Sequence, residues 1–240
     1  FFIDKDSGEI FINEINTYRD ESKAAFLPRF FKTGKGEYGE GDQFIGVVVP
    51  NLRIVAKKHF DADFDTLREL LASPYHEYRL TALLALTYRY AKLKDHTSRE
   101  TCVNFYVSQV DAINNWDLVD LSCYKILGHW LFDKDKQLLY DWAKENHLWK
   151  QRIAMISCMH FVKQGEFKDA LAIADLLQHH PHDLIHKAVG WILREIGKED
   201  EQLLIDYLTP RYKEMPRTML RYAIERFEEG KRKAFLNSTI

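Results

Sequence analysis

A helical pattern of apolar residues, repeated along most of the chain, is the feature that most limits its possible folds. In the segment 77–93, Leu80, Leu83 and Leu84 fall at helical spacings and form one stripe. No Asn-Gly or Asp-Gly pair joins two alternating stretches, so the usual sequence signal of a β-hairpin is absent. The sequence therefore predicts an all-α protein. Helices are expected over residues 51–59, 63–72, 77–93, 97–110, 115–132, 134–145, 148–163, 166–178, 183–197, 200–208 and 215–228.

Four of these helices begin alike, with a basic residue just before an apolar run. The stretches are YRLTALLAL, QRIAMISCM, HKAVGWILR and PRTMLRYAI, and their basic residues are Arg79, Arg152, Lys187 and Arg217. Repeats of roughly 30 to 45 residues built from helix pairs are typical of HEAT-like solenoids. We therefore expect residues 1–240 to form a single domain, a HEAT-like α-helical repeat solenoid in which antiparallel helix pairs stack into a curved superhelix.

The recurring basic residues have two interpretations. In such a stack the starts of successive helices form a row, and helix N-termini attract phosphates, so added Arg and Lys side chains would create a cationic track. Alternatively, each basic residue simply meets solvent in the first turn of its helix. The net charge is −2, so a nucleic-acid surface would have to come from such a local arrangement.

The segment KTGKGEYGEGDQFIGVVVP (32–50) interrupts the helical pattern and contains five of the eleven glycines. It lacks the Gly-Lys-Ser/Thr ending of a phosphate-binding P-loop, which argues against nucleotide binding. We interpret it as a loop between helices. Its Lys32 and Lys35 are candidate contacts to a polyanion.

Composition excludes several other classes of protein. No stretch approaches about 18 uncharged apolar residues, so no membrane span is predicted. Cys102, Cys123 and Cys158 are far apart without a CxxC motif, which indicates reduced core thiols in a cytoplasmic protein. The HHPH sequence (179–182) suggests either a metal site or a turn between helices; we favour the turn, because no well-placed partner ligands stand elsewhere.

The stretch NNWDLVDLS (114–122) carries the strongest candidate for chemistry. Trp116 and Asp120 are four residues apart, which places both side chains on one helix face. Asn114 or Asn115 suits the N-cap and Asp117 suits the first turn, so capping does not account for Asp120. The pair is either a surface carboxylate beside a half-buried indole or a site for a positively charged substrate.

Three motifs, WDLVD, LWKQRIA and HKAVGWILREIGK, together resemble the DNA alkylation repair glycosylases of the AlkD family in order and separation. The segment GKGEYGEGDQFIGVVVPNLR is similar to that family's first helical segments, so the resemblance covers nearly the whole chain. It implies a monomeric HEAT-like enzyme that needs no metal or cofactor. The implied reaction is hydrolysis of the N-glycosidic bond of cationic N3- or N7-alkylated purines, such as 3-methyladenine and 7-methylguanine, in double-stranded DNA.

The resemblance also implies roles for individual residues. Asp120 matches the family's catalytic carboxylate, and Trp116 and Trp191 match the aromatic residues that bracket the sugar of the lesion. Arg152 matches the basic residue that holds the DNA backbone. Lys187 and Arg194 are further candidates for DNA binding, although Arg194 could equally pair with Glu195 or a neighbouring acid. Together with the cationic track and the glycine-rich loop, the predicted DNA-binding residues are Arg152, Lys187, Arg194, Arg79, Lys32 and Lys35.

Two other functions share part of this pattern. A non-catalytic binder of DNA or RNA structure would keep the cationic groove, and a protein-interaction scaffold would keep only the helical repeats. A scaffold has no reason to hold Trp116, Asp120, Arg152 and Trp191 together. We therefore expect a monofunctional alkylpurine DNA glycosylase.

Overall fold

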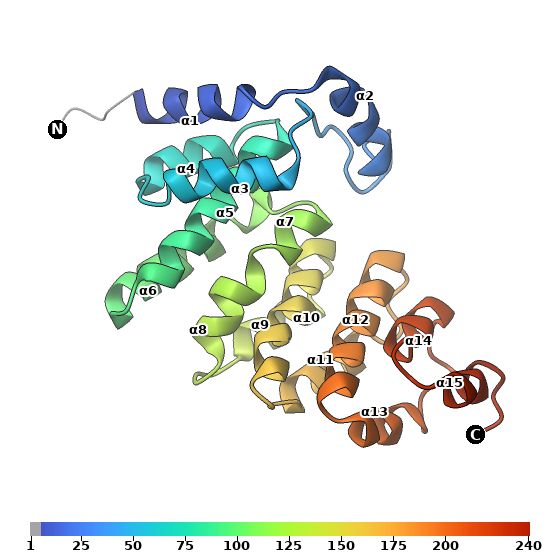
Figure 1. Ribbon diagram of the computed structural model, residues 1–240. Coiled ribbons are helices and arrows are strands. Elements are labelled where there is room, and N and C mark those ends of the chain that lie inside the picture. The colour runs from blue at the N-terminus through green and yellow to red at the C-terminus, as the bar shows by residue number, and fades with distance from the viewer. Residues whose placement is uncertain (1–5) are drawn as a thin grey trace. The chain divides into compact units, whose positions relative to one another are not determined.

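The computed structural model describes residues 6–240 and is all-α, as predicted (Figure 1). Within these residues no β-strand forms, and extended backbone pairs only at an isolated bridge between Gln43 and Tyr75. No helix among them combines the length and the apolar character that a bilayer-spanning segment requires. The chain divides after Ser122 into two compact units, which we call the N-terminal unit and the C-terminal unit.

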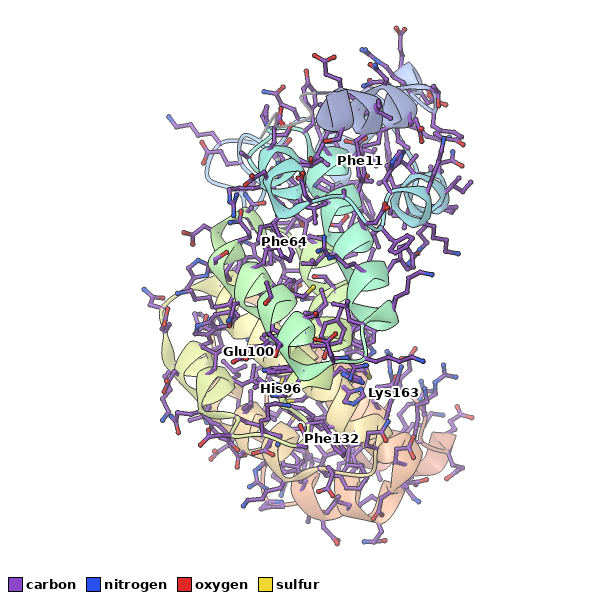
Figure 2. The ribbon with its side chains drawn as sticks, turned by 90° about the vertical axis from the view of Figure 1, so that its left-hand side faces the viewer. Phe11, Phe64, His96, Glu100, Phe132 and Lys163 are labelled. Carbon is purple, nitrogen blue, oxygen red and sulfur yellow. The ribbon has the colours of Figure 1, made fainter. Side chains whose placement is uncertain are left out.

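The N-terminal unit is built around α5, a long helix that packs against both α3 and α4. Helix α1 lies along α3 and α4 (Figure 1), and its Phe11 (Figure 2) is buried in that packing. The helices of this unit are α1 (Asp6–Asn16), α2 (Glu21–Phe30), α3 (Val49–Lys58), α4 (Phe64–Leu71), α5 (His76–Lys92), α6 (His96–Ser108), a 3-10 turn η1 (Val110–Ala112) and α7 (Trp116–Asp120).

The glycine-rich segment is a loop between α2 and α3, as the sequence predicts. Its last part is fastened to the start of α5 by the buried Glu77, whose carboxylate accepts hydrogen bonds from the backbone N–H groups of residues 45–47 at 2.7–3.2 Å. At Gly46 the backbone is left-handed, with φ 84°, and a Cβ there would lie 1.9 Å from the carbonyl oxygen of Asp20. Only glycine therefore allows the loop to approach the start of α2 so closely.

In the C-terminal unit, successive helix pairs stack side by side. Helix α12 packs against both α10 and α14, while α9 and α11 form the neighbouring row (Figure 1). The helical repeat predicted from the recurring motifs is thus present in this unit. Its helices are a π-helical turn η2 (Tyr124–Gly128), α8 (His129–Leu131), α9 (Gln137–Lys144), α10 (Leu148–Lys163), α11 (Lys168–Leu177), α12 (Asp183–Glu199), α13 (Glu201–Leu208), α14 (Arg217–Ala223) and α15 (Glu229–Leu236).

Two predicted helices differ from the structure. The helix predicted over 115–132 is interrupted after Asp120, where the Ser122 hydroxyl donates to the carbonyl of Leu118 at 2.6 Å and competes with regular helical bonding. The helix predicted over 215–228 ends at Ala223. Glu228, the last residue of the predicted helix, instead caps the start of the next helix, because its carboxylate accepts hydrogen bonds from the backbone N–H groups of Gly230 and Lys231.

The HHPH sequence forms the turn between α11 and α12, as predicted. His182 is the N-cap of α12, and its Nδ1 accepts from the backbone N–H of Leu184 at 3.0 Å. His180 contacts the Gln151 amide oxygen through Nε2 at 2.8 Å. These histidines therefore organise a helix junction.

Candidate active site

A pocket of about 390 Å³ in the N-terminal unit brings Trp116 and Asp120 together. Both residues of the predicted pair therefore line the same pocket. Most of the wall is aliphatic or aromatic, and among the charged lining groups His76, Glu77 and Asp117 are buried. The remaining charged groups of the wall are Lys23 and Asp120. The lining residues are Lys23, Leu27, Phe30, Phe31, Phe44, Val47, Val48, Val49, Leu52, His76, Glu77, Leu80, Trp116, Asp117, Asp120 and Leu121.

Aromatic rings form one continuous side of the pocket. The indole of Trp116 stacks on Phe31, with centroids 5.3 Å apart and an interplanar angle of 21°. Phe30 meets the same indole edge-on at 6.0 Å, and Phe31 stacks on Phe44 at 5.1 Å. Phe30 is 50% exposed, so part of this aromatic surface is open to solvent. Such ring faces attract cations electrostatically.

The short helix α7 is held at its start by local polar contacts. Asn115 is the N-cap, one of the two residues predicted for that position, and its side-chain oxygen accepts from the backbone N–H of Trp116 at 2.7 Å. Asp117 lies in the first turn, as expected, and accepts from the N–H of Leu118 at 2.8 Å. These contacts orient the turn from which Trp116 and Asp120 project.

A buried charge network, which the spacing of residues in the sequence does not predict, lies beside the pocket. His76 is 2% exposed; its Nδ1 lies 2.8 Å from Oδ2 of Asp42, and its Nε2 lies 2.6 Å from Oδ2 of Asp117. Burial by itself favours the neutral imidazole, but the charges and hydrogen bonds of Asp117 and Asp42 outweigh it and raise the pKa of His76 to about 9. The imidazolium is thus the form present at neutral pH.

Arg79 belongs to this network, and this corrects the DNA contact predicted for it. The side chain is 4% exposed, pairs with Asp42, and donates to the carbonyl of Ser73 at 3.0 Å and to the side-chain oxygen of Asn114 at 3.1 Å. Burial favours the neutral carboxyl, yet His76 and Arg79 hold the pKa of Asp42 below its ordinary value. A guanidinium enclosed in this way does not reach a DNA phosphate on the surface.

The sequence did contain a signal for this network. Helix α5 is apolar on nearly every side, so it is expected to be buried, yet its first turn carries a histidine, a glutamate and an arginine in HEYRL. Buried charges need partners. The partners lie 34 and 41 residues from His76, which local pattern does not reveal.

In the C-terminal unit, Arg152 lies on α10 and is also largely enclosed. It is 5% exposed, and its guanidinium donates to the carbonyl of Leu184 at the start of α12. This contact ties two neighbouring helices together. It leaves little of the guanidinium for the phosphate contact predicted from the resemblance.

The other predicted residues of this unit lie on α12. Trp191 is partly exposed. Lys187 forms an ion pair with Asp183 at 3.0 Å, and Arg194 pairs with Glu225, as the alternative of a neighbouring acid anticipated. Both pairs are at least partly exposed, so water screens them and a competing polyanion can displace them at small cost.

In the loop of the N-terminal unit, Lys32 and Lys35 are exposed, as a contact to a polyanion requires. Lys32 has a left-handed backbone, with φ 56°. The structure thus leaves Lys32, Lys35 and Lys187 as the more accessible of the predicted cationic contacts.

Two of three comparisons with known proteins find similarities to this chain. A family model described as DNA alkylation repair enzyme matches residues 11–227. The fold is similar to a solved structure titled "Predicted DNA alkylation repair enzyme from Enterococcus faecalis", with a TM-score of 0.68 and 14% identity over 88% of this chain and 97% of that one. It is also similar to AlkD2 from Streptococcus mutans, with a TM-score of 0.54 and 15% identity over 87% of this chain and 99% of that one. A comparison with curated proteins finds no significant match.

Proposed function

The chain belongs to the DNA alkylation repair enzyme family, and on that premise we propose that it is a monofunctional DNA glycosylase acting on cationic N3- or N7-alkylated purines in duplex DNA. The observation that carries the proposal is the pocket of the N-terminal unit, where the Asp120 carboxylate and the Trp116 indole share one wall.

The proposed reaction does not require a general acid from the protein. An N3- or N7-alkylated purine is already positively charged, so it departs with the bonding electron pair as a neutral base. Water adds to C1′ of the deoxyribose and releases one proton, which leaves an abasic site. The transition state resembles an oxocarbenium ion, with positive charge on the sugar.

Two groups of the pocket suit that transition state. A carboxylate held near C1′ stabilises the developing charge and orients the attacking water, which is the proposed role of Asp120. The faces of Trp116 and Phe30 attract a cationic nucleotide with roughly 0.5–2 kcal/mol each. We assign the role of the carboxylate to Asp120 because it lines the pocket together with Trp116, four residues earlier on α7.

The roles that the resemblance implies for Trp191, Lys187 and Arg194 stay predictions, whereas the enclosed Arg152 is expected to contribute little to phosphate binding. Lys32 and Lys35 are exposed, and Lys187 is partly exposed. All three are suited to phosphate contacts, which release counterions and make binding depend on salt. Trp191 is tested by replacing it with alanine in the assay that follows.

Single-turnover release of alkylated bases tests the proposal. Duplex DNA treated with a methylating agent is incubated with excess protein, and the released bases are separated by chromatography. We expect wild-type protein to release 3-methyladenine or 7-methylguanine, and Asp120→Asn to slow release by about 100- to 1,000-fold, the usual effect of removing one electrostatic contact to a transition state.

A matched control is Asp133→Asn in the C-terminal unit, whose carboxylate is 77% exposed and pairs with Lys134. It carries the same change of charge and should release bases at the wild-type rate. Release by Asp120→Asn at that same rate would falsify the catalytic assignment. Tight DNA binding by wild type without any base release would favour a non-catalytic binder.

A further inference from the structure

His76 lies where three elements of the N-terminal unit meet. It begins α5, lines the pocket, and contacts Asp42 in the loop between α2 and α3 and Asp117 on α7. The two carboxylates come from parts of the chain far apart in sequence. The imidazole ring is thus a bridge between the loop and the helix that carries Trp116 and Asp120.

The bridge requires a protonated ring. A neutral imidazole has one N–H donor and one nitrogen acceptor, whereas an imidazolium donates from both nitrogens. Both nitrogens of His76 lie within hydrogen-bond distance of a carboxylate oxygen, at 2.8 Å and 2.6 Å. Loss of the proton would set a nitrogen lone pair against a carboxylate, and one of the two contacts would open.

The ring also takes part in the aromatic wall of the pocket. It stacks on Phe44 with centroids 4.8 Å apart and tilts against Phe31 at 4.7 Å. Phe31 in turn stacks on the Trp116 indole. If the imidazole rotated, Phe31 would have to shift, and the Trp116 ring stacked on it would shift as well.

Helix α7 depends on such support. It has five residues, too few for a helix to be stable by its own backbone hydrogen bonds. Its packing within the unit is chiefly against α5. The contact of Asp117 with His76 adds an ion pair to that packing.

We propose that His76 is a positioning residue, an imidazolium that clamps α7 to the 31–48 loop and thereby sets the Trp116 ring and the Asp120 carboxylate in the pocket. The elevated pKa of about 9 supports this, because the clamp then stays closed throughout the physiological range. Its consequence for catalysis rests on the proposed function.

Charged groups on the surrounding elements determine the charge balance around His76. With His76 protonated, the two cations and the two carboxylates of the network balance; without that proton, one negative charge is uncompensated. Glu77 is satisfied separately by the backbone N–H groups of the loop. The charged groups are Asp42 on the loop, Asp117 and Asp120 on α7, Lys23 on α2, and Glu77 and Arg79 on α5.

A pH titration of the wild-type protein by NMR tests the clamp without requiring any activity. Carbon-bound ring protons of Trp116 and His76 are assigned by Trp116→Phe and His76→Gln. We expect both residues to titrate together with one midpoint near pH 9, while the Trp142 ring in the C-terminal unit shows no transition at that midpoint. An ordinary His76 midpoint of about 6.5, or a Trp116 resonance indifferent to His76 titration, overturns the proposal.

A second measurement addresses catalysis. His76→Gln keeps one donor but no charge, and we expect it to slow single-turnover base release on the order of 10- to 100-fold, since small misplacements of reacting groups have effects of that size. Its Kd for DNA should stay within about twofold, because the residue is buried. Unchanged release by His76→Gln contradicts the positioning role. If the wild-type protein releases no base, the proposed glycosylase function is refuted. The role of His76 as a clamp is still tested by the NMR titration, which does not require activity.

Discussion

The pH dependence of unfolding offers a direct measure of the buried network around His76. The native pKa of His76 is about 9, whereas an unfolded chain gives histidine its ordinary value of about 6.5. Below pH 6.5 both states bind the proton, and the stabilisation is fully present. Between pH 6.5 and 9 only the native state binds it, so the free energy of unfolding falls as pH rises through the native pKa.

The size of the effect follows from the two pKa values. A tenfold difference in proton affinity corresponds to about 1.4 kcal/mol, so the stabilisation lost between pH 6.5 and the region above pH 9 is about 3 kcal/mol. His76→Gln removes the titrating group. The difference in unfolding free energy between wild type and His76→Gln should therefore shrink by about that amount over this range.

Urea denaturation followed by far-UV circular dichroism, at pH 6, 7, 8 and 9.5, provides the measurement. The control is His96→Gln, because His96 on α6 (Figure 2) is exposed and lies 3.9 Å from Glu100. Its stability should follow wild type at every pH. Parallel curves for wild type and His76→Gln would show that the network does not hold a proton in the way the geometry indicates.

Three further predictions concern the loop and two cationic residues. Gly46→Ala should lower Tm more than Gly41→Ala, because both have φ 84° but only at Gly46 would a Cβ meet the Asp20 carbonyl; equal Tm values would refute the steric argument. Lys187→Ala should reduce the slope of log Kd for DNA against log salt by about 1. Arg152→Ala should instead lower Tm and leave that slope unchanged, since its guanidinium is enclosed and bonded to a main-chain carbonyl; a flatter slope for Arg152→Ala would restore the predicted phosphate contact.

Helical periodicity and the i, i+4 spacing of Trp116 and Asp120 are local properties that can be read from the amino-acid sequence alone. They predict which side chains share a helix face, because an α-helix repeats every 3.6 residues. The same holds for the N-cap at Asn115 and for the glycine-rich loop.

Only the tertiary structure decided which charged side chains are buried and which groups they pair with. Arg79 and Arg152 look in sequence like basic residues at helix starts, yet both are buried with partners from other elements. No sequence motif marks His76 as a functional residue, yet folding places its ring between the carboxylates of Asp42 and Asp117. A side chain's protonation and accessibility depend on the groups that packing brings within a few ångströms, and those groups are distant along the chain.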